Sequence, residues 1–356
     1  MERFFNTAGP VNPAKHYYLP LEDRLDLEEI LSLIGQEKYF ILHAPRQTGK
    51  TSSVLALMRI LNQSGEYRAL YVNVEAAQAY RENIEAAMET ITGEIAHQAN
   101  IYLEDPCPQT IVAEFTRKGT FNNALRTLLA AWAAACPLPL VIFIDEIDSL
   151  VGDTLISVLR QLRAGYTDRP RHFPQSIVLC GVRDVRDYRI HSSKTKEIIT
   201  GGSAYNIKAE SLRLGDFSRE EVEKLLLYHT SASGQIFQPE AMDVIWHNTR
   251  GQPWLVNALA YEICFRKKEN RNRSIGISAS MVEEAAETLI RRRETHLDQL
   301  SDKLREERVR RVIQPILAGE EVPETIPEDD VQYVLDLGLI RRNGQIEIAN
   351  RIYREV

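Results

Sequence analysis

The chain has 356 residues, of which 26% are charged and 44% hydrophobic, and its net charge is −7. These values are typical of globular proteins and exclude disordered, collagen-like and membrane-embedded chains. The length predicts two or three domains. The acidic balance excludes a protein that binds nucleic acid over its whole surface, but it leaves room for a local basic patch.

Elements are predicted to alternate between strand and helix up to about residue 215, and to be helical after it. A first helix is predicted over Leu27–Ile34, with Asp26 and Glu29 at capping-box spacing. Apolar strands are predicted at residues 39–44, 69–74, 138–144, 177–182 and 211–214. Their near-continuous apolar character predicts a five-stranded parallel sheet covered on both faces, with crossover helices at 80–97 and 121–135.

The second half is predicted to open with a capping box at Ser218–Glu221. Further helices are predicted at residues 241–247, 254–265, 281–291 (behind Ser280), 300–317 and 329–337. Asn343-Gly344 between two alternating apolar arms predicts a β-hairpin. Helices followed by a two-stranded hairpin predict a winged helix at the end of the chain.

Two features bear on the environment of the protein. It contains four cysteines without a Cys-x-x-Cys pair: Cys107, Cys136, Cys180 and Cys264. This spacing indicates neither a zinc site nor a disulfide framework, and with no secretory signal it predicts a cytoplasmic protein. The apolar run 128–144 is cut by Pro137 and Pro139, which favours a buried helix and strand over a membrane span.

The clearest motif follows the first long strand and precedes a helix: Ala44-Pro45-Arg46-Gln47-Thr48-Gly49-Lys50-Thr51. This is the pattern of a phosphate-binding loop, with alanine where the first glycine is usual. Its backbone N–H groups, together with Ser52 in the next helical turn, are predicted to hold the phosphates of ATP. Lys50 is predicted to reach the β- and γ-phosphates, and the Thr51 hydroxyl is predicted to bind Mg²⁺.

A second motif supplies the acids that such a loop requires. The buried strand that ends at Ile144 is followed by Asp145 and Glu146. Asp145 is predicted to bind Mg²⁺ and Glu146 to act as general base on the attacking water. Asp148 is predicted to be structural or to orient the other two acids.

These motifs together resemble the AAA+ and STAND superfamilies of P-loop ATPases. In those families the strand after the Asp-Glu strand carries a nucleotide sensor, which the resemblance assigns to Arg183; the alternative is a surface arginine paired with Asp184. Gly251-Gln252-Pro253 resembles the Gly-x-Pro of STAND and archaeal-type lids, which implies that Pro253 lies near the adenine. The alternative is that Gly251 only ends one helix and Pro253 only begins the next.

The resemblance also implies a division into four parts: an N-terminal segment at the nucleotide site (1–36), a P-loop ATPase core (37–215), a helical lid (216–294) and a winged helix (295–356). In the first part, Tyr17, Tyr18 and Pro20 lie where these families place an adenine-side segment. Some relatives continue into an effector domain, so the chain is expected to be either a minimal form or a truncated one.

Nucleic acid and protein partners stay open at this stage. Basic clusters occur around Arg266–Arg273 and at Arg291–Arg293, and each is either a solvated helix end or a contact to a phosphate backbone. If the winged helix binds DNA, Arg341 and Arg342 are expected to contribute. Arg186 and Arg189 are candidates for an arginine finger that acts on a neighbouring subunit. The leading hypothesis is a slow or regulated Mg-ATP-hydrolysing switch that acts on an effector domain or protein partner. The alternative is a nucleotide-bound DNA-binding module of initiator or transposition-regulator type.

Overall fold

The computed structural model describes residues 2–184, 189–191, 198–200, 205–292 and 294–356. The chain forms two compact units. The sheet unit comprises Asp26–His43 and Ser53–Arg213, and the helical unit comprises Met1–Leu25, Ala44–Ser52 and Leu214–Val356. The chain therefore passes between the units at four places, and the predicted phosphate loop groups with the helical unit.

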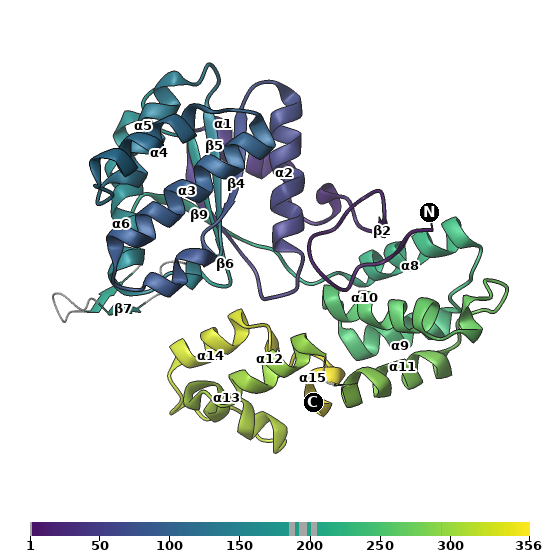
Figure 1. The fold of residues 1–356 in the computed structure, drawn as a ribbon. Coiled ribbons are helices and arrows are strands. Elements are labelled where there is room, and N and C mark those ends of the chain that lie inside the picture. The colour runs from purple at the N-terminus through teal and green to yellow at the C-terminus, as the bar shows by residue number, and fades with distance from the viewer. Residues whose placement is uncertain (1, 185–188, 192–197, 201–204, 293) are drawn as a thin grey trace. The chain divides into compact units, whose positions relative to one another are not determined.

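A five-stranded parallel sheet forms the centre of the sheet unit (Figure 1), in the order β4-β5-β6-β3-β9. The strands are β3 (Tyr39–His43), β4 (Arg68–Asn73), β5 (Leu140–Asp145), β6 (Ser176–Gly181) and β9 (Lys208–Arg213). Every neighbouring pair is parallel, so all five strands end at one edge of the sheet. The predicted α/β fold class is confirmed.

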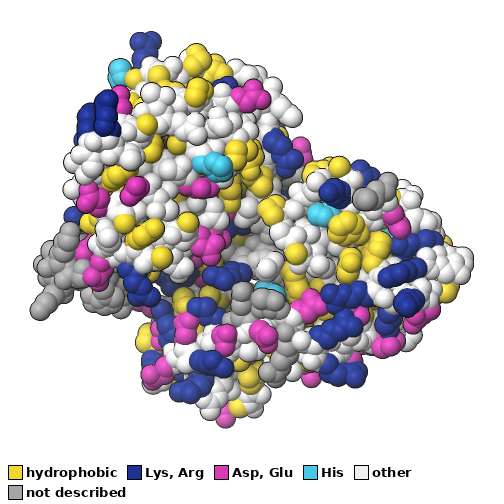
Figure 2. Space-filling view, in the orientation of Figure 1, with side chains coloured by type: hydrophobic (Ala, Val, Ile, Leu, Met, Phe, Trp, Pro, Cys, Tyr) yellow, Lys and Arg dark blue, Asp and Glu magenta, His cyan; other side chains and the backbone are white. Residues whose placement is uncertain are grey.

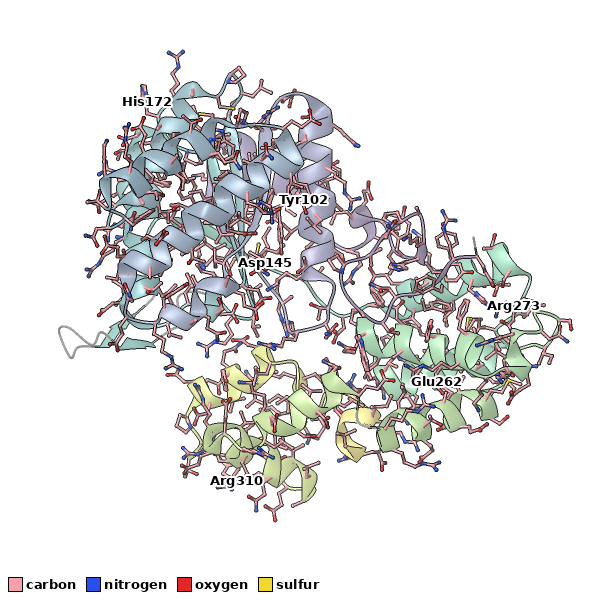
Figure 3. All side chains as sticks on the ribbon, in the orientation of Figure 1. Tyr102, Asp145, His172, Glu262, Arg273 and Arg310 are labelled. Atoms are coloured by element: carbon pink, nitrogen blue, oxygen red, sulfur yellow. The ribbon has the colours of Figure 1, made fainter. Side chains whose placement is uncertain are left out.

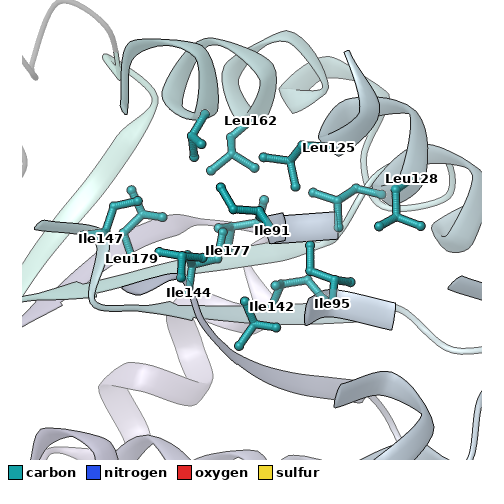
Figure 4. Close-up of a cluster of buried hydrophobic side chains, with 14 of the residues drawn as sticks. Ile91, Ile95, Leu125, Leu128, Ile142, Ile144, Ile147, Leu162, Ile177 and Leu179 are labelled. Atoms are coloured by element: carbon teal, nitrogen blue, oxygen red, sulfur yellow. The ribbon is translucent and has the colours of Figure 1, made fainter. Parts of the chain in front are cut away.

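Helices cover this sheet. They are α1 (Leu27–Gly35), α2 (Lys50–Ser64), α3 (Ile84–Leu103), α4 (Cys107–Lys118), α5 (Ala124–Ala135) and α6 (Gly152–Ala164). Figure 4 shows Leu125, Leu128 and Leu162 above the strand residues Ile142 and Ile177, all fully buried. Burying each such side chain stabilises the fold by roughly 1.5–3 kcal/mol, so this layer dominates the sheet unit's core. A small hairpin, β7 (Arg189–His191) with β8 (Ile198–Thr200), completes the unit.

The helical unit begins with two short parallel strands, β1 (Phe4–Phe5) and β2 (His16–Tyr17). Its first helices are α8 (Arg219–Ser233), α9 (Pro239–Thr249), α10 (Pro253–Tyr261), a π turn (Glu262–Arg266) and α11 (Ala279–Arg292). Phe5 and Tyr17 are buried in the core that these helices form. The N-terminal segment is thus an integral part of the helical layer.

The last elements are α12 (Thr295–Lys303), α13 (Glu307–Leu317), α14 (Glu328–Asp336), β10 (Ile340–Asn343), β11 (Gln345–Ile348) and α15 (Arg351–Glu355). The predicted hairpin is present, and Gly344 makes its turn at φ 78°. Residues of α13, α14 and β10 share a hydrophobic core of their own. We call residues 295–350 the C-terminal module.

Several predicted boundaries are wrong. The expected helix 300–317 is two helices, because the chain turns at Leu304–Glu306, where Lys303 holds the Glu306 carboxylate at 2.6 Å. The strand expected from Leu138 begins at Leu140, since Pro139 has no N–H to donate. The helix expected from Tyr80 begins after Asn83, whose side chain accepts from Ala86 N. The helix expected behind Ser280 already includes Ser280.

Two further expectations concerned the long apolar run and the cysteines. Residues 128–144 form the end of α5 and most of β5, as predicted. All four cysteines are free. Within the described part of the chain, we find no helix of the length and apolarity needed to cross a membrane.

Candidate functional site

Three strand ends of the sheet carry the predicted motifs. The phosphate loop follows His43 at the end of β3, Asp145 ends β5, and Arg183 lies just beyond β6. In the sheet β6 lies between β3 and β5. Because the strands are parallel, His43, Asp145 and Gly181 share the carboxyl edge, where open α/β sheets bind their ligands.

The phosphate loop has the backbone that an anion site requires. Gln47 and Gly49 have positive φ angles of 63° and 91°, and α2 begins at Lys50. Thr48 Oγ1 donates to Pro45 O at 2.8 Å, which closes the loop on itself. Alternating left-handed residues turn successive N–H groups to one concave side, next to a helix N-terminus. This arrangement fits a nucleotide phosphate.

Other segments of the helical unit hold the loop from outside. Gln252 Nε2 donates to Gln47 O at 3.4 Å, and Arg24 Nη2 donates to Thr48 O at 3.3 Å. The hydroxyl of Ser52, a predicted nucleotide contact, accepts from Val11 N at 2.9 Å. Gly338 of the C-terminal module lies so close that a Cβ there would be 2.9 Å from Pro45 Cβ.

The Gly-x-Pro segment forms the start of α10. Gly251 has φ 82°, Gln252 caps the helix by accepting from Leu255 N at 2.7 Å, and Pro253 is buried in the first turn. Phe217 N donates to Gly251 O at 2.8 Å, which ties this turn to the start of α8. Pro253 therefore belongs to the same unit as the loop.

Asp145 is fully buried at the end of β5 (Figure 3) and is held on both oxygens. Its Oδ1 accepts from Glu146 N at 2.9 Å, and its Oδ2 accepts from the Tyr71 hydroxyl at 3.2 Å. Burial and then the Asp145 charge raise the pKa of Tyr71 above its usual value, so this hydroxyl stays protonated and donates. Tyr71 was not predicted; the sequence signal was a tyrosine inside the buried strand next to β5.

Glu146 has a backbone conformation that is rare for its residue type. Its φ is 58° and its ψ 37°, in the left-handed region. Non-glycine residues held there store strain, and such residues concentrate at functional sites. This left-handed conformation ends the strand at Asp145, so Glu146 lies just beyond the carboxyl edge of the sheet.

The remaining acids at this edge have structural partners. Asp148 Oδ1 accepts from Val182 N at 3.3 Å and so joins the Asp-Glu segment to the exit of β6. Asp184 forms a buried ion pair with Lys208 at 2.5 Å. Arg183 is partly buried between these two contacts. Arg186 and the side chain of Arg189, the two finger candidates, lie outside the described residues.

The donor chemistry fits magnesium better than a transition metal. No group of three or more His, Cys, Asp or Glu side chains in the described ranges could hold a metal ion. Mg²⁺ in nucleotide sites takes one or two protein oxygens and completes its shell with phosphates and water. Asp145, a single buried carboxylate at the end of β5, is a protein oxygen ligand of this kind.

Tyr17, expected near the adenine, instead lies in an aromatic cluster. Its ring centroid is 4.9 Å from that of Phe5 and 5.2 Å from that of His229. Burial raises the pKa of Tyr17 to about 12. Its side chain is therefore part of the core of the helical unit, and only Tyr18 and Pro20 of the predicted segment keep exposed surface.

Six basic side chains of the basic clusters and the predicted wing have acidic partners. Ion pairs join Arg266 to Glu294, Lys267 to Glu284, Arg273 to Glu2, Arg292 to Glu262, Arg341 to Glu347 and Arg342 to Glu328. Figure 2 shows basic and acidic side chains interspersed on the visible face of the helical unit. Arg293 lies outside the described residues.

Comparison with known proteins agrees with this geometry. A Walker-type ATPase of Pyrococcus abyssi has a similar structure at a TM-score of 0.65 and 13% identity, with 98% of each chain covered. The ORC2 protein of Aeropyrum pernix, solved in ADPNP–ADP complexes, is similar at a TM-score of 0.56 and 14% identity, covering 95% of this chain and 93% of that one. At these identities the likeness concerns the fold. No curated protein matches the sequence.

The family is shown by the sequence itself. Residues 40–220, just over half of the chain, match the ATPase family associated with various cellular activities (AAA). The match begins in β3, includes the phosphate loop and the Asp-Glu segment, and ends in α8. This chain therefore belongs to the AAA family of ATPases.

Proposed function

We propose that the protein is a switch ATPase of STAND or archaeal AAA-like type that binds and slowly hydrolyses Mg-ATP. Lys50 binds the β- and γ-phosphates, and Thr51 and Asp145 hold the magnesium ion, which neutralises phosphate charge when bound. Glu146 accepts a proton from the attacking water. Arg183 senses the γ-phosphate, and Pro253 connects nucleotide state to the lid.

One observation carries this proposal: β6 lies between β3 and β5 in a sheet whose neighbouring strands are all parallel. That order places the strand end before the loop and the strand end bearing Asp145 at one edge, with the strand that leads to Arg183 between them. The strained backbone of Glu146 and the double anchoring of Asp145 support a site built for chemistry.

The division of labour follows the predicted boundaries. Residues 37–215 act as ATPase core, 216–294 as lid, and 295–356 as a winged helix that relays the state to a protein partner or effector domain. The N-terminal segment, residues 1–36, contributes to the nucleotide site through Tyr18 and Pro20, whereas Tyr17 belongs to the core of the helical unit. Three helices, a hairpin and a separate hydrophobic core in the C-terminal module support the winged-helix assignment.

Two substitutions test the mechanism. Lys50→Ala is expected to abolish binding of a fluorescent ATP analogue, and Glu146→Gln is expected to bind it but to hydrolyse ATP at least ~100-fold more slowly. Lys118→Ala and Glu114→Gln, from an exposed ion pair on α4, are matched controls that should leave both readouts unchanged. ATP hydrolysis at the wild-type rate by the Glu146 variant would contradict the assignment of Glu146 as general base.

The charges described above do not favour the DNA-binding alternative. The arginines of the predicted wing are paired with Glu347 and Glu328, at 2.8 Å in both cases. ATP turnover measured with and without duplex DNA separates the two functions, because the switch proposal predicts no stimulation by DNA.

A further inference from the structure

Arg24 contacts both the phosphate loop and the segment that leads into α8. Its Nη2 donates to Gly215 O at 2.8 Å and to Thr48 O at 3.3 Å. Its Nη1 lies 3.4 Å from Asp216 O and 3.5 Å from Glu221 Oε2. The guanidinium also stacks on the Phe217 ring, 4.5 Å from its centroid, and only 8% of the side chain is exposed.

These contacts fall where the chain passes between the two units. The chain leaves the helical unit after Leu25 and returns to it at Leu214, so Arg24 and Gly215 each lie one residue from such a crossing. Thr48 lies in the segment Ala44–Ser52, which the helical unit contributes between the other two crossings. All the contacted atoms belong to the helical unit. One side chain therefore joins the three segments of that unit at the points from which the sheet unit's chain departs.

We propose that Arg24 is a positioning residue that couples the phosphate loop to the lid. This inference rests on the proposed nucleotide function of the loop. Arg24 acts on the loop through the Thr48 carbonyl, and on the lid through Gly215 and Glu221.

The coupling follows from the planarity of one peptide bond. The Thr48 carbonyl and the Gly49 N–H belong to the same rigid peptide unit, so any rotation that turns this N–H toward a phosphate also moves the carbonyl. Nη2 bridges that carbonyl to the Gly215 carbonyl, four residues before α8 begins at Arg219. A reorientation of the loop is thus passed directly to the start of the lid.

Arginine is the side chain suited to this task. Its planar fork keeps several donors at fixed angles and remains charged when buried, whereas a lysine ammonium is a single compact centre. Glu221, held in the capping box of α8, faces the fork and compensates its charge.

Hydrogen exchange measured by mass spectrometry tests the coupling in the full chain. Exchange in peptides from the phosphate loop and from α8 is compared without nucleotide and with a non-hydrolysable ATP analogue and Mg²⁺. The variants are Arg24→Gln and Arg24→Lys. Arg219→Gln is the matched control, since Arg219 also lies at the start of α8 but is exposed and forms ion pairs with Glu223 and Asp243.

In the wild-type chain and the control, we expect the analogue to protect the loop and to change exchange in α8. In both Arg24 variants the loop should still be protected, while the α8 response falls at least about fivefold, the lower end of ordinary coupling. If Arg24→Gln does not fold, Arg24→Lys decides. A folded Arg24 variant with a wild-type α8 response would overturn the proposal, whereas absence of loop protection in the wild-type chain would count against the proposed nucleotide function instead.

Discussion

Asp145 accepts a hydrogen bond from a neighbour outside the motifs, Tyr71. Its carboxylate is fully buried and accepts hydrogen bonds from the Tyr71 hydroxyl and from Glu146 N. Removing a donor from a buried charged acceptor costs about 1–3 kcal/mol. We expect Tyr71→Phe to lower the free energy of unfolding by that amount in chemical denaturation. Tyr102→Phe, at an exposed tyrosine on α3, should change it by less than about 0.5 kcal/mol, and equal effects would contradict the role of Tyr71.

His296 makes the stability depend on pH. It is buried, its Nε2 lies 2.8 Å from the Tyr353 hydroxyl, and burial, with a smaller effect of Arg46, lowers its pKa from 6.5 to about 4. The unfolded chain therefore binds the proton first, so stability is full above pH 6.5 and falls as the pH drops toward 4.

The contribution of His296 to the pH dependence of the free energy of unfolding can be measured against His296→Gln, which has no titrating side chain at this position. Between pH 7 and pH 5 the wild-type chain should lose about 2 kcal/mol more stability than His296→Gln. Denaturation at several pH values gives both slopes, and parallel curves for the two chains would show that His296 does not titrate as described.

Residues in the motifs could be predicted from sequence because their spacing along the chain is itself the signal. Lys50 and Thr51 lie where a helix begins, and Asp145 lies where a strand ends, as predicted. Arg24 and Tyr71 could not be found in this way. Their partners, Gly215 and Asp145, are distant in sequence and are brought near only by the packing of complete elements.

At the scale of elements, the turn between α9 and α10 depends on the absence of one side chain. Gly251 has φ 82°, and a Cβ there would lie 1.9 Å from the Phe217 carbonyl oxygen. Gly251→Ala must therefore displace the backbone at the start of α8. We expect a loss of about 2–4 kcal/mol in the free energy of unfolding, from strain and clash together.

Gly276→Ala is the matched control in the same helical layer. Its Cβ would meet only ordinary contacts at 3.7 Å and 3.8 Å, and it has no positive φ angle. We expect less than about 0.5 kcal/mol for this change. If Gly251→Ala lowered the free energy of unfolding equally little in the same denaturation assay, Gly251 would serve only to end α9 and would not be needed for close contact with Phe217.

The same scale shows why element types were easier to predict than their limits. Apolar runs identified β3, β4, β5 and β6, because strands buried on both faces need little else. The edge strand β9 is mostly polar and partly exposed, and the prediction at 211–214 overlapped only its last three residues. The break between α12 and α13 could not be read from the sequence, since Leu304–Glu306 carry neither glycine nor proline. Tertiary contacts make that turn, including a hydrogen bond from the Tyr333 hydroxyl to Glu306 at 2.8 Å.

At the scale of the whole molecule, the net charge of −7 has a local counterpart in the C-terminal module. Helix α14, which directly precedes the hairpin, carries four acidic residues and no basic one: Glu328, Asp329, Asp330 and Asp336. Asp330 pairs with Arg308 and Arg311 of α13. Any phosphate backbone that approached α14 would meet negative charge and arginines whose charge is already compensated.

The module is therefore expected not to bind duplex DNA, even at low salt. Each phosphate contact made by a basic side chain would add about −0.9 to the slope of log affinity against log salt, so fluorescence anisotropy over a salt series is a sensitive test. Arg341→Gln with Arg342→Gln should change nothing, because both side chains are held at 2.8 Å by Glu347 and Glu328. Replacing those two acids with glutamine releases both arginines and should raise any residual DNA affinity. A steep salt dependence in the wild-type chain that disappears in the double-arginine variant would instead establish the hairpin as a DNA contact and restore the initiator-type alternative.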